Sequence, residues 1–207
     1  MSRKRVVIFI SGGGSNMEAL IRAAEAADFP AEIVAVFSDK AEAGGLVKAQ
    51  GAGIATQVFK RKDYASKDAH EDAILEALAA LKPDIICLAG YMRLLSGRFI
   101  APYEGRILNI HPSLLPLFPG LHTHQRALDA GMKVAGCTVH LVTEGMDEGP
   151  ILAQAAVPVR AGDNAETLAA RVLKAEHQLY AAALRKFAAG QAVVQSDEPA
   201  DCVVVSV

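Results

Sequence analysis

Short apolar runs alternate with helix-like segments over the first half of the chain, and this alternation limits the possible folds more than any other feature. The runs, which are typical of parallel strands covered on both faces, lie at residues 6–10, 33–37, 54–59, 85–89 and 106–110. Helices are predicted between them at residues 17–27, 46–50, 66–81 and 97–103. We therefore expect an α/β fold with an open, mostly parallel twisted sheet, Rossmann-like in its N-terminal half, and helices on both faces.

The second half has a different pattern. A proline-containing loop follows residue 111, and a helix is predicted at 123–130. Strand-like runs at 136–142 and 151–159 predict an antiparallel C-terminal extension, and an Ala/Leu-rich helix is predicted at 165–189. No repeat or change of composition marks a boundary. Residues 1–190 are therefore expected to form a single domain, followed by a tail at 191–207 that fits either a late strand or disorder.

Charge and cysteine content exclude several classes of protein. Lys and Arg number 21 against 23 Asp and Glu, and this net charge of -2 argues against a nucleic-acid partner. Cys87, Cys137 and Cys202 are odd in number and far apart, which argues against a disulfide framework and favours a cytoplasmic location. The apolar run at 6–10 is too short for a signal peptide or a membrane span, so no membrane partner is expected.

A glycine-rich loop at residues 11–16 (SGGGSN) joins the first predicted strand to the first helix, where sheets of this kind bind ligands. Ser15 and Glu18 have the spacing of a capping box, which predicts that the helix begins at Ser15. Backbone N–H groups without side-chain bulk suit a phosphate. The loop is not a Walker A motif, because no Gly-Lys-[Ser/Thr] follows. It is not a dinucleotide fingerprint either, because Met17 stands where the third glycine is needed. A tight turn without a ligand is the alternative.

Asn109 and His111 lie at the end of the last strand of the parallel half, and their spacing places both side chains on one face. A carboxamide donor beside an imidazole suits a developing oxyanion and proton transfer. A structural pair of hydrogen-bonded side chains explains the pattern equally well.

The segment 143–150 is acidic, and a carboxylate near His111 would favour the imidazolium form. Glu144, Asp147 and Glu148 compete for this role, and spacing does not choose among them. Without other information, a solvated hairpin loop is the simpler interpretation.

The other histidines do not predict a site. His122 and His124 have no clear third ligand nearby, so no metal site is expected. His140 and His70 are expected to be structural or exposed.

Two longer motifs point to a known family. The segments LAGYMRLLS at 88–96 and LNIHPSLLP at 108–116, with the glycine-rich loop and DEGP at 147–150, resemble the folate-dependent formyltransferases. The resemblance extends over about residues 6–187. Within that family the chain is most similar to the enzymes that formylate glycinamide ribonucleotide in purine biosynthesis.

The resemblance implies a reaction and a set of residues. The formyl group of 10-formyltetrahydrofolate passes through a tetrahedral intermediate to the amine of glycinamide ribonucleotide, with no metal and no tightly bound cofactor. Residues 1–190 then form one formyltransferase catalytic domain, a monomer or a homodimer that binds only small molecules. The catalytic residues implied are Asn109, His111 and Asp147. The residues implied for the ribonucleotide are Gly14, Ser15, Asn16 and Glu176. The residues implied for the folate are Lys67, Met92, Arg93, Leu94, Leu95 and Asn109. The family usually has arginine at the position of Lys67, so this contact departs from the pattern.

Two relatives share the Asn-x-His…Asp arrangement. Formyltetrahydrofolate hydrolase carries an additional N-terminal regulatory domain, and methionyl-tRNA formyltransferase an additional C-terminal RNA-binding domain; neither is expected here. A non-catalytic folate-binding or nucleotide-binding module is the remaining alternative.

Overall fold

The computed structural model describes residues 2–191. The strands form one hydrogen-bonded sheet that is mostly parallel, with antiparallel strands at its C-terminal end. Their order across the sheet is β3 (Ala55–Val58), β2 (Ala31–Ser38), β1 (Lys4–Ile10), β4 (Ile85–Leu88), β5 (Ile107–His111), β6 (Val134–Leu141) and β7 (Ile151–Pro158). The predicted fold class is confirmed. The chain divides into two compact units, Met1–Leu108 and Asn109–Val207.

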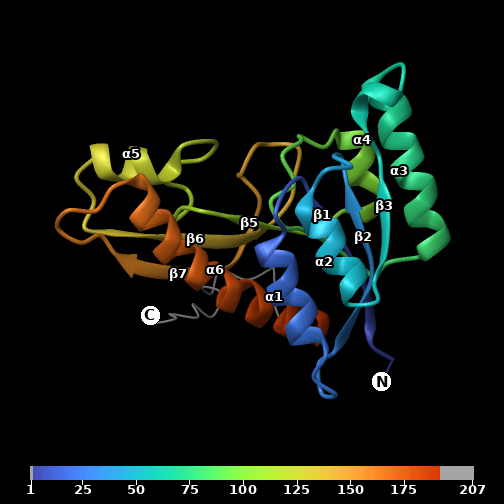
Figure 1. Cartoon of the computed structure of the whole chain (residues 1–207), viewed down its shortest axis with the longest axis horizontal. Coiled ribbons are helices and arrows are strands. Elements are labelled where there is room, and N and C mark those ends of the chain that lie inside the picture. The colour runs from blue at the N-terminus through green and yellow to red at the C-terminus, as the bar shows by residue number, and fades with distance from the viewer. Residues whose placement is uncertain (1, 192–207) are drawn as a thin grey trace. The chain divides into compact units, whose positions relative to one another are not determined.

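The N-terminal unit contains the alternating elements that the apolar runs predict (Figure 1). They are β1 (Lys4–Ile10), α1 (Ser15–Ala24), β2 (Ala31–Ser38), α2 (Gly44–Gly51), β3 (Ala55–Val58), the 3-10 turn η1 (Arg61–Asp63), α3 (Lys67–Leu81), β4 (Ile85–Leu88), α4 (Gly97–Ile100) and the 3-10 turn η2 (Ala101–Tyr103).

The core of this unit is built around β1. Residues 6–10 of that strand are fully buried, as a strand covered on both faces requires. β1 pairs in parallel with β2 on one side and with β4 on the other. Because parallel crossovers are right-handed and the strand order reverses after β3, α1 and α2 lie on one face of the sheet and α3 on the other. Accordingly, α1 contacts α2, and α3 contacts α4.

The glycine-rich loop begins α1 at Ser15, as predicted, but the predicted capping box is wrong. Gly14 occupies the N-cap position with φ 70° and ψ 30°, and no side chain caps the helix. Ser15 is therefore already inside the first turn, where its hydroxyl is not placed to accept from the third helical residue. The Glu18 carboxylate instead pairs with Lys48 Nζ of α2 at 2.7 Å.

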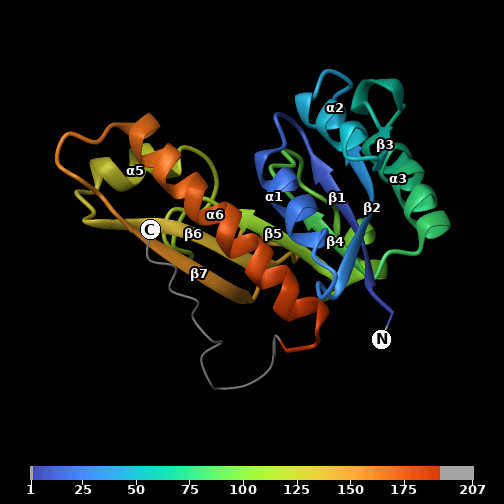
Figure 2. The same cartoon turned by 60° about the horizontal axis from the view of Figure 1, so that its bottom comes forward.

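The C-terminal unit contains the antiparallel extension. β5 (Ile107–His111) runs into it from the first unit, and α5 (Thr123–Asp129), β6 (Val134–Leu141), β7 (Ile151–Pro158) and α6 (Ala165–Ala188) follow. β6 and β7 pair antiparallel, as predicted. Figure 2 shows α6 lying along β6 and β7, and it contacts both strands.

Two predictions about domain organisation stay open. The division into two units leaves the single catalytic domain at 1–190 a prediction. The late strand or disordered tail considered for the C-terminus lies outside the described residues. Within residues 2–191, none of the helices combines the length and the apolar character that a membrane span requires.

Candidate active site

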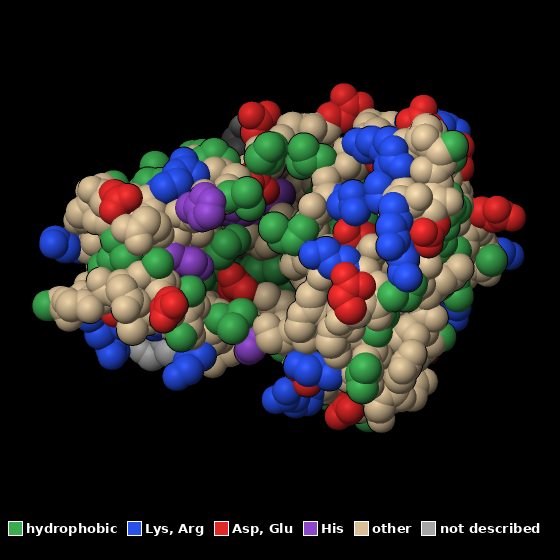
Figure 3. All heavy atoms as spheres, turned by 45° about the horizontal axis from the view of Figure 1, so that its top comes forward, with side chains coloured by type: hydrophobic (Ala, Val, Ile, Leu, Met, Phe, Trp, Pro, Cys, Tyr) green, Lys and Arg blue, Asp and Glu red, His purple; other side chains and the backbone are tan. Residues whose placement is uncertain are grey.

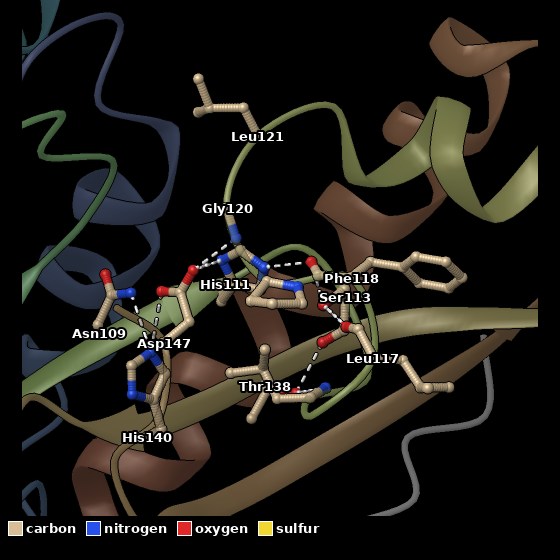
Figure 4. Close-up of polar contacts among 12 residues, drawn as sticks. Asn109, His111, Ser113, Leu117, Phe118, Gly120, Leu121, Thr138, His140 and Asp147 are labelled. Atoms are coloured by element: carbon tan, nitrogen blue, oxygen red, sulfur yellow. Dashed lines mark hydrogen bonds and ion pairs between the residues drawn. The ribbon is translucent and has the colours of Figure 1, made fainter. Parts of the chain in front are cut away.

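The end of β5 carries two polar side chains of the C-terminal unit, Asn109 and His111. Asn109 is half-buried and His111 is 6% exposed, and Ile110 between them is buried. The Asn109 carboxamide lies on His140 of β6, with 3.1 Å between Asn109 Nδ2 and His140 Nε2 (Figure 4). The two-residue spacing thus brings both polar groups into one cluster, as predicted.

The hydrogen bonds of His140 define its tautomer. His140 is 2% exposed, and its Nδ1 lies 3.0 Å from Leu141 O, a carbonyl that can only accept. Nδ1 therefore carries the proton, and Nε2 of the neutral ring accepts from Asn109 Nδ2. Burial lowers the pKa of His140; the hydrogen bond to Leu141 O and the charge of Asp147 only partly offset this effect. Because Nε2 of the neutral ring can only accept, the Nδ2 end of the Asn109 carboxamide faces His140 and donates to it.

Both ring nitrogens of His111 face acceptors. Nε2 lies 3.1 Å from Phe118 O, and Nδ1 lies 3.4 Å from Asp147 Oδ2. Since a backbone carbonyl and a carboxylate both accept, only the imidazolium form satisfies the two contacts at once. His111 thus lies between a backbone carbonyl and the Asp147 carboxylate.

The loop between β6 and β7 supplies one acid to this cluster. Asp147 has φ 57°, and its Oδ2 accepts from Gly120 N at 2.8 Å (Figure 4). Its Oδ1 lies 3.7 Å from His140 Nε2, so the carboxylate is close to both histidines. Glu144 and Glu148 are exposed. Of the three acids that sequence spacing did not distinguish, Asp147 is therefore the one that lies beside His111.

The loop after β5 is tied to β6 by Thr138. Thr138 Oγ1 donates to Ser113 O at 2.7 Å and accepts from Leu115 N at 3.0 Å. Ser113 Oγ donates mainly to Leu117 O at 2.6 Å and also lies 3.2 Å from Phe118 O, the carbonyl that His111 contacts. These bonds place the Phe118 carbonyl against the imidazole, so they help to fix the orientation of His111.

Glu176 lies on α6, and His122 and His124 lie at the start of α5. Glu176 is 7% exposed on α6, and burial followed by the charge of Glu176 raises the pKa of the Cys137 thiol. His122 has φ 57° at the start of α5, and burial followed by the charge of His111 lowers the pKa of His124. Among the described residues, no group of three or more potential metal ligands gathers.

The N-terminal unit brings together two segments that the family resemblance assigns to ligands. The glycine-rich loop follows β1 and the 92–95 segment follows β4, the neighbouring parallel strand. Ser11 Oγ accepts from Met92 N at 2.9 Å, and Ser11 N donates to Gly90 O at 3.1 Å. Asn16 is buried in the first turn of α1. The two loops are thus joined at the carboxyl ends of adjacent strands, where open sheets bind ligands.

The residues expected at the folate surround one cavity of about 300 Å³ in this unit. Its lining includes Lys67, all of the 92–95 segment, and four residues that the resemblance did not name, Arg61, His70, Glu71 and Tyr91. Figure 3 shows Lys and Arg side chains gathered on the N-terminal unit, at the right, with acidic side chains among them. Met92 and Leu94 are 64% and 63% exposed, so the 92–95 segment presents apolar surface at the cavity.

Buried acids hold this segment in place. Arg93 Nε donates to Asp39 Oδ2 at 2.7 Å, and the Asp39 side chain is 2% exposed. Glu71 accepts from Ser96 N at 3.0 Å through Oε1 and from Ser96 Oγ through Oε2. Lys67 Nζ lies 3.7 Å from Glu71 Oε1, so the lysine at the position where the family usually has arginine faces this buried carboxylate.

Sequence reasoning missed the residues that hold the expected site residues. His140 was expected to be structural or exposed, and it is a buried residue that contacts Asn109; Thr138, Asp39 and Glu71 were not among the predicted residues. One signal was available for two of them. Thr138 and His140 are polar, two residues apart in an otherwise apolar strand, and therefore on one face. Asp39 and Glu71 act through contacts distant in sequence, which no local pattern shows.

Comparisons with known proteins agree with the family resemblance. A family model described as formyl transferase matches residues 4–184. The trifunctional purine biosynthetic protein adenosine-3 of Bos taurus is 50% identical over 188 residues, which are 91% of this chain and 19% of that protein. The chain thus spans about a fifth of the length of that relative. The phosphoribosylglycinamide formyltransferase of Escherichia coli (strain K12) is 45% identical over 186 residues, 90% of this chain and 88% of that protein.

Solved structures show the same likeness. A crystal structure of phosphoribosylglycinamide formyltransferase from Brucella melitensis is 86% identical with a TM-score of 0.89, covering 93% of this chain and 99% of that one. Glycinamide ribonucleotide transformylase 1 from Symbiobacterium toebii is 47% identical with a TM-score of 0.91, covering 93% of this chain and 91% of that one. Because the formyl transferase model matches most of its length, this chain belongs to the formyl transferase family.

Proposed function

We propose that this chain is a phosphoribosylglycinamide formyltransferase of purine biosynthesis, which transfers the formyl group of 10-formyltetrahydrofolate to the amine of glycinamide ribonucleotide. Its family and its similarity to phosphoribosylglycinamide formyltransferases support the reaction. The observation that carries the proposal is the cluster of Asn109, His111 and Asp147 with His140 in the C-terminal unit. We call Asn109, His111 and Asp147 the catalytic trio.

The reaction needs an oxyanion donor and a route for one proton. The ribonucleotide amine attacks the formyl carbon, forming a C–N bond and a tetrahedral oxyanion. The bond from that carbon to N10 of the folate then breaks, and the proton lost by the amine goes to N10. The products are formylglycinamide ribonucleotide and tetrahydrofolate, without a covalent enzyme intermediate.

Asn109 is proposed to stabilise the oxyanion. Its Nδ2 has two hydrogens, and His140 Nε2 accepts one of them. The second remains for the substrate, and the carboxamide does not have to reorient to supply it. Pre-oriented donors of this kind contribute strongly to catalysis, because no reorganisation accompanies the reaction.

His111 is proposed to share this task and to assist the proton transfer. Asp147 faces Nδ1, and a carboxylate at this position would favour the imidazolium form. The Nε2–H group would exchange Phe118 O for the substrate oxygen as negative charge develops there. This exchange favours the transition state over the bound substrate, as catalysis requires.

The ligand sites are also proposals. Gly14, Ser15 and Asn16 would bind the ribonucleotide phosphate, because they begin α1 and the N-terminus of a helix favours an anion. Glu176 would contact the ribonucleotide. Lys67 and the 92–95 segment would bind the folate, and the 300 Å³ cavity that they line supports this assignment.

Three further expectations belong to the same proposal. The enzyme would hold no tightly bound cofactor or metal, with the folate as co-substrate. It would act on small molecules in the cytoplasm, and it would be a monomer or a homodimer.

The proposed reaction is tested by incubating the protein with 10-formyltetrahydrofolate and glycinamide ribonucleotide and following the release of deformylated folate. We expect release that requires the ribonucleotide and matches the amount of formylated product. Equal release without the ribonucleotide would indicate a hydrolase. Binding of either ligand without release would indicate a non-catalytic binding module.

A further inference from the structure

We propose that Gly45, the second residue of α2, is a positioning residue that sets the affinity for the ribonucleotide phosphate. The inference rests on the proposed function of the glycine-rich loop. In sequence, Gly45 is distant from the residues expected to bind the ribonucleotide, since it lies between β2 and β3. Its role follows from its contact with the loop.

The backbones of Gly45 and Gly14 touch. A Cβ atom built on Gly14 would lie 2.9 Å from Gly45 Cα, and a Cβ atom built on Gly45 would lie 3.1 Å from Gly14 Cα and 3.2 Å from Gly12 O. Neither position has room for a side chain without movement of the other backbone. The start of α2 is therefore packed directly against the glycine-rich loop.

One hydrogen bond between Gly45 and the glycine-rich loop fixes the orientation of a peptide group in that loop. Gly45 N donates to Gly12 O at 3.1 Å. In a trans peptide the C=O and N–H groups of one unit point in opposite directions. Holding the Gly12 carbonyl toward α2 therefore directs the Gly13 N–H away from α2. Gly45 thus sets the direction of a backbone donor in the loop proposed to bind the phosphate.

The neighbouring glycine provides a matched control. Gly44 is exposed and nothing lies within 4 Å of a Cβ atom built there, whereas Gly45 is buried. Both residues are helical, so Gly→Ala raises the helix propensity equally at the two positions. Only the methyl group added at position 45 would contact the glycine-rich loop and displace it.

The test compares Gly44→Ala with Gly45→Ala. For Gly45→Ala we expect the KM for glycinamide ribonucleotide to rise about tenfold, the effect of losing one well-oriented hydrogen bond to a charged group, with the KM for the folate and kcat near wild type. Gly44→Ala should leave all three constants near wild type. Equal ribonucleotide KM values for the two variants, or a parallel rise of both KM values in Gly45→Ala, would overturn the proposal.

A second variant separates the loop contact from core packing. The closest atom to the added methyl group is Ile10 Cδ1 at 2.6 Å, which the double variant Ile10→Val/Gly45→Ala removes. We expect this double variant to keep the raised KM for the ribonucleotide, because the methyl group added at position 45 still contacts Gly12 O and Gly14 Cα. A return to the wild-type value would assign the effect to Ile10 and reject the positioning role. A wild-type enzyme that neither binds nor formylates the ribonucleotide would instead reject the proposed function, and this inference with it.

Discussion

At the scale of single residues, the candidate active site depends on which groups donate and which accept. The Leu141 carbonyl makes Nδ1 of His140 a donor, and this leaves Nε2 to accept from Asn109. In contrast, both nitrogens of His111 face acceptors. The two histidines of one cluster thus have different partners: one nitrogen of the neutral His140 ring accepts from Asn109, whereas both nitrogens of His111 lie against acceptors.

The buried, neutral state of His140 predicts how stability depends on pH. The pKa of His140 is lowered in the native state, so between that value and the ordinary pKa of about 6.5 the unfolded chain binds more protons. The free energy of unfolding should therefore fall as the pH drops below about 6.5. His140→Gln cannot take up this proton and keeps an acceptor for Asn109, so its unfolding free energy should depend less steeply on pH.

Chemical denaturation of both proteins at a series of pH values measures this difference. Burial also lowers the pKa of His124, so the variant keeps part of the slope. Identical slopes for wild type and His140→Gln would contradict the neutral, buried state of His140.

Residue patterns predicted the candidate catalytic cluster only in part. The spacing of Asn109 and His111 placed both on one face because side chains alternate along a strand. The choice of Asp147 over Glu144 and Glu148 depends on the fold of the 143–150 loop, which spacing does not define; only the family resemblance indicated it. His140 was missed because a single histidine in an apolar strand is compatible with many structural roles.

At the scale of elements, the sequence predicted the strands and helices well but the capping of helices poorly. The Ser15/Glu18 pattern predicts a capping box that α1 does not make, because Gly14 takes the N-cap position. The reciprocal box belongs to α6, where Asn164 Oδ1 accepts from Thr167 N at 2.9 Å and Thr167 Oγ1 accepts from Asn164 N at 3.0 Å. A capping pattern depends on backbone angles that the tertiary fold sets.

The α6 cap gives a direct stability prediction. Asn164→Ala should lower the free energy of unfolding by about 1 kcal/mol, because it leaves a first-turn N–H group without its acceptor. Asn164→Ser keeps an acceptor and should remain close to wild type. Denaturant titration distinguishes the two variants, and equal losses in both would show that the cap does not stabilise α6.

The loop after β4 gives a functional prediction at the same scale. Glu71 holds Ser96 at the end of the 92–95 segment through two hydrogen bonds, so Glu71→Gln should loosen this segment. We expect the KM for the folate to rise about fivefold to tenfold, the range of one impaired hydrogen bond to a charged group, with the KM for the ribonucleotide unchanged.

Asp72 is the matched control for Glu71. It lies next to Glu71 on α3, but it is about half exposed and pairs with Arg98 Nη2 at 2.6 Å outside this segment. Asp72→Asn should leave both KM values near wild type, because exposed ion pairs contribute little. Steady-state kinetics that show no difference between the two variants would reject a positioning role for Glu71.

At the scale of the whole molecule, the chain divides its expected tasks between two compact units. The N-terminal unit holds the glycine-rich loop and the cavity lined by Lys67 and the 92–95 segment. The C-terminal unit holds the catalytic trio and Glu176. The sequence predicted the β-α alternation of the first unit and the antiparallel strands of the second, but no composition break indicates the boundary, because β5 runs through it without interruption.

The central claim, that the catalytic trio performs formyl transfer, is tested most directly by the turnover of Asp147→Asn. Asparagine keeps an acceptor for Gly120 N but loses the charge that favours the His111 imidazolium, so kcat should fall on the order of 10²–10³-fold. The rise in Tm on adding glycinamide ribonucleotide should persist, and Glu148→Gln, an exposed acid in the same loop, should turn over like wild type. A kcat near wild type for Asp147→Asn, or an equal loss in Glu148→Gln, would contradict the account.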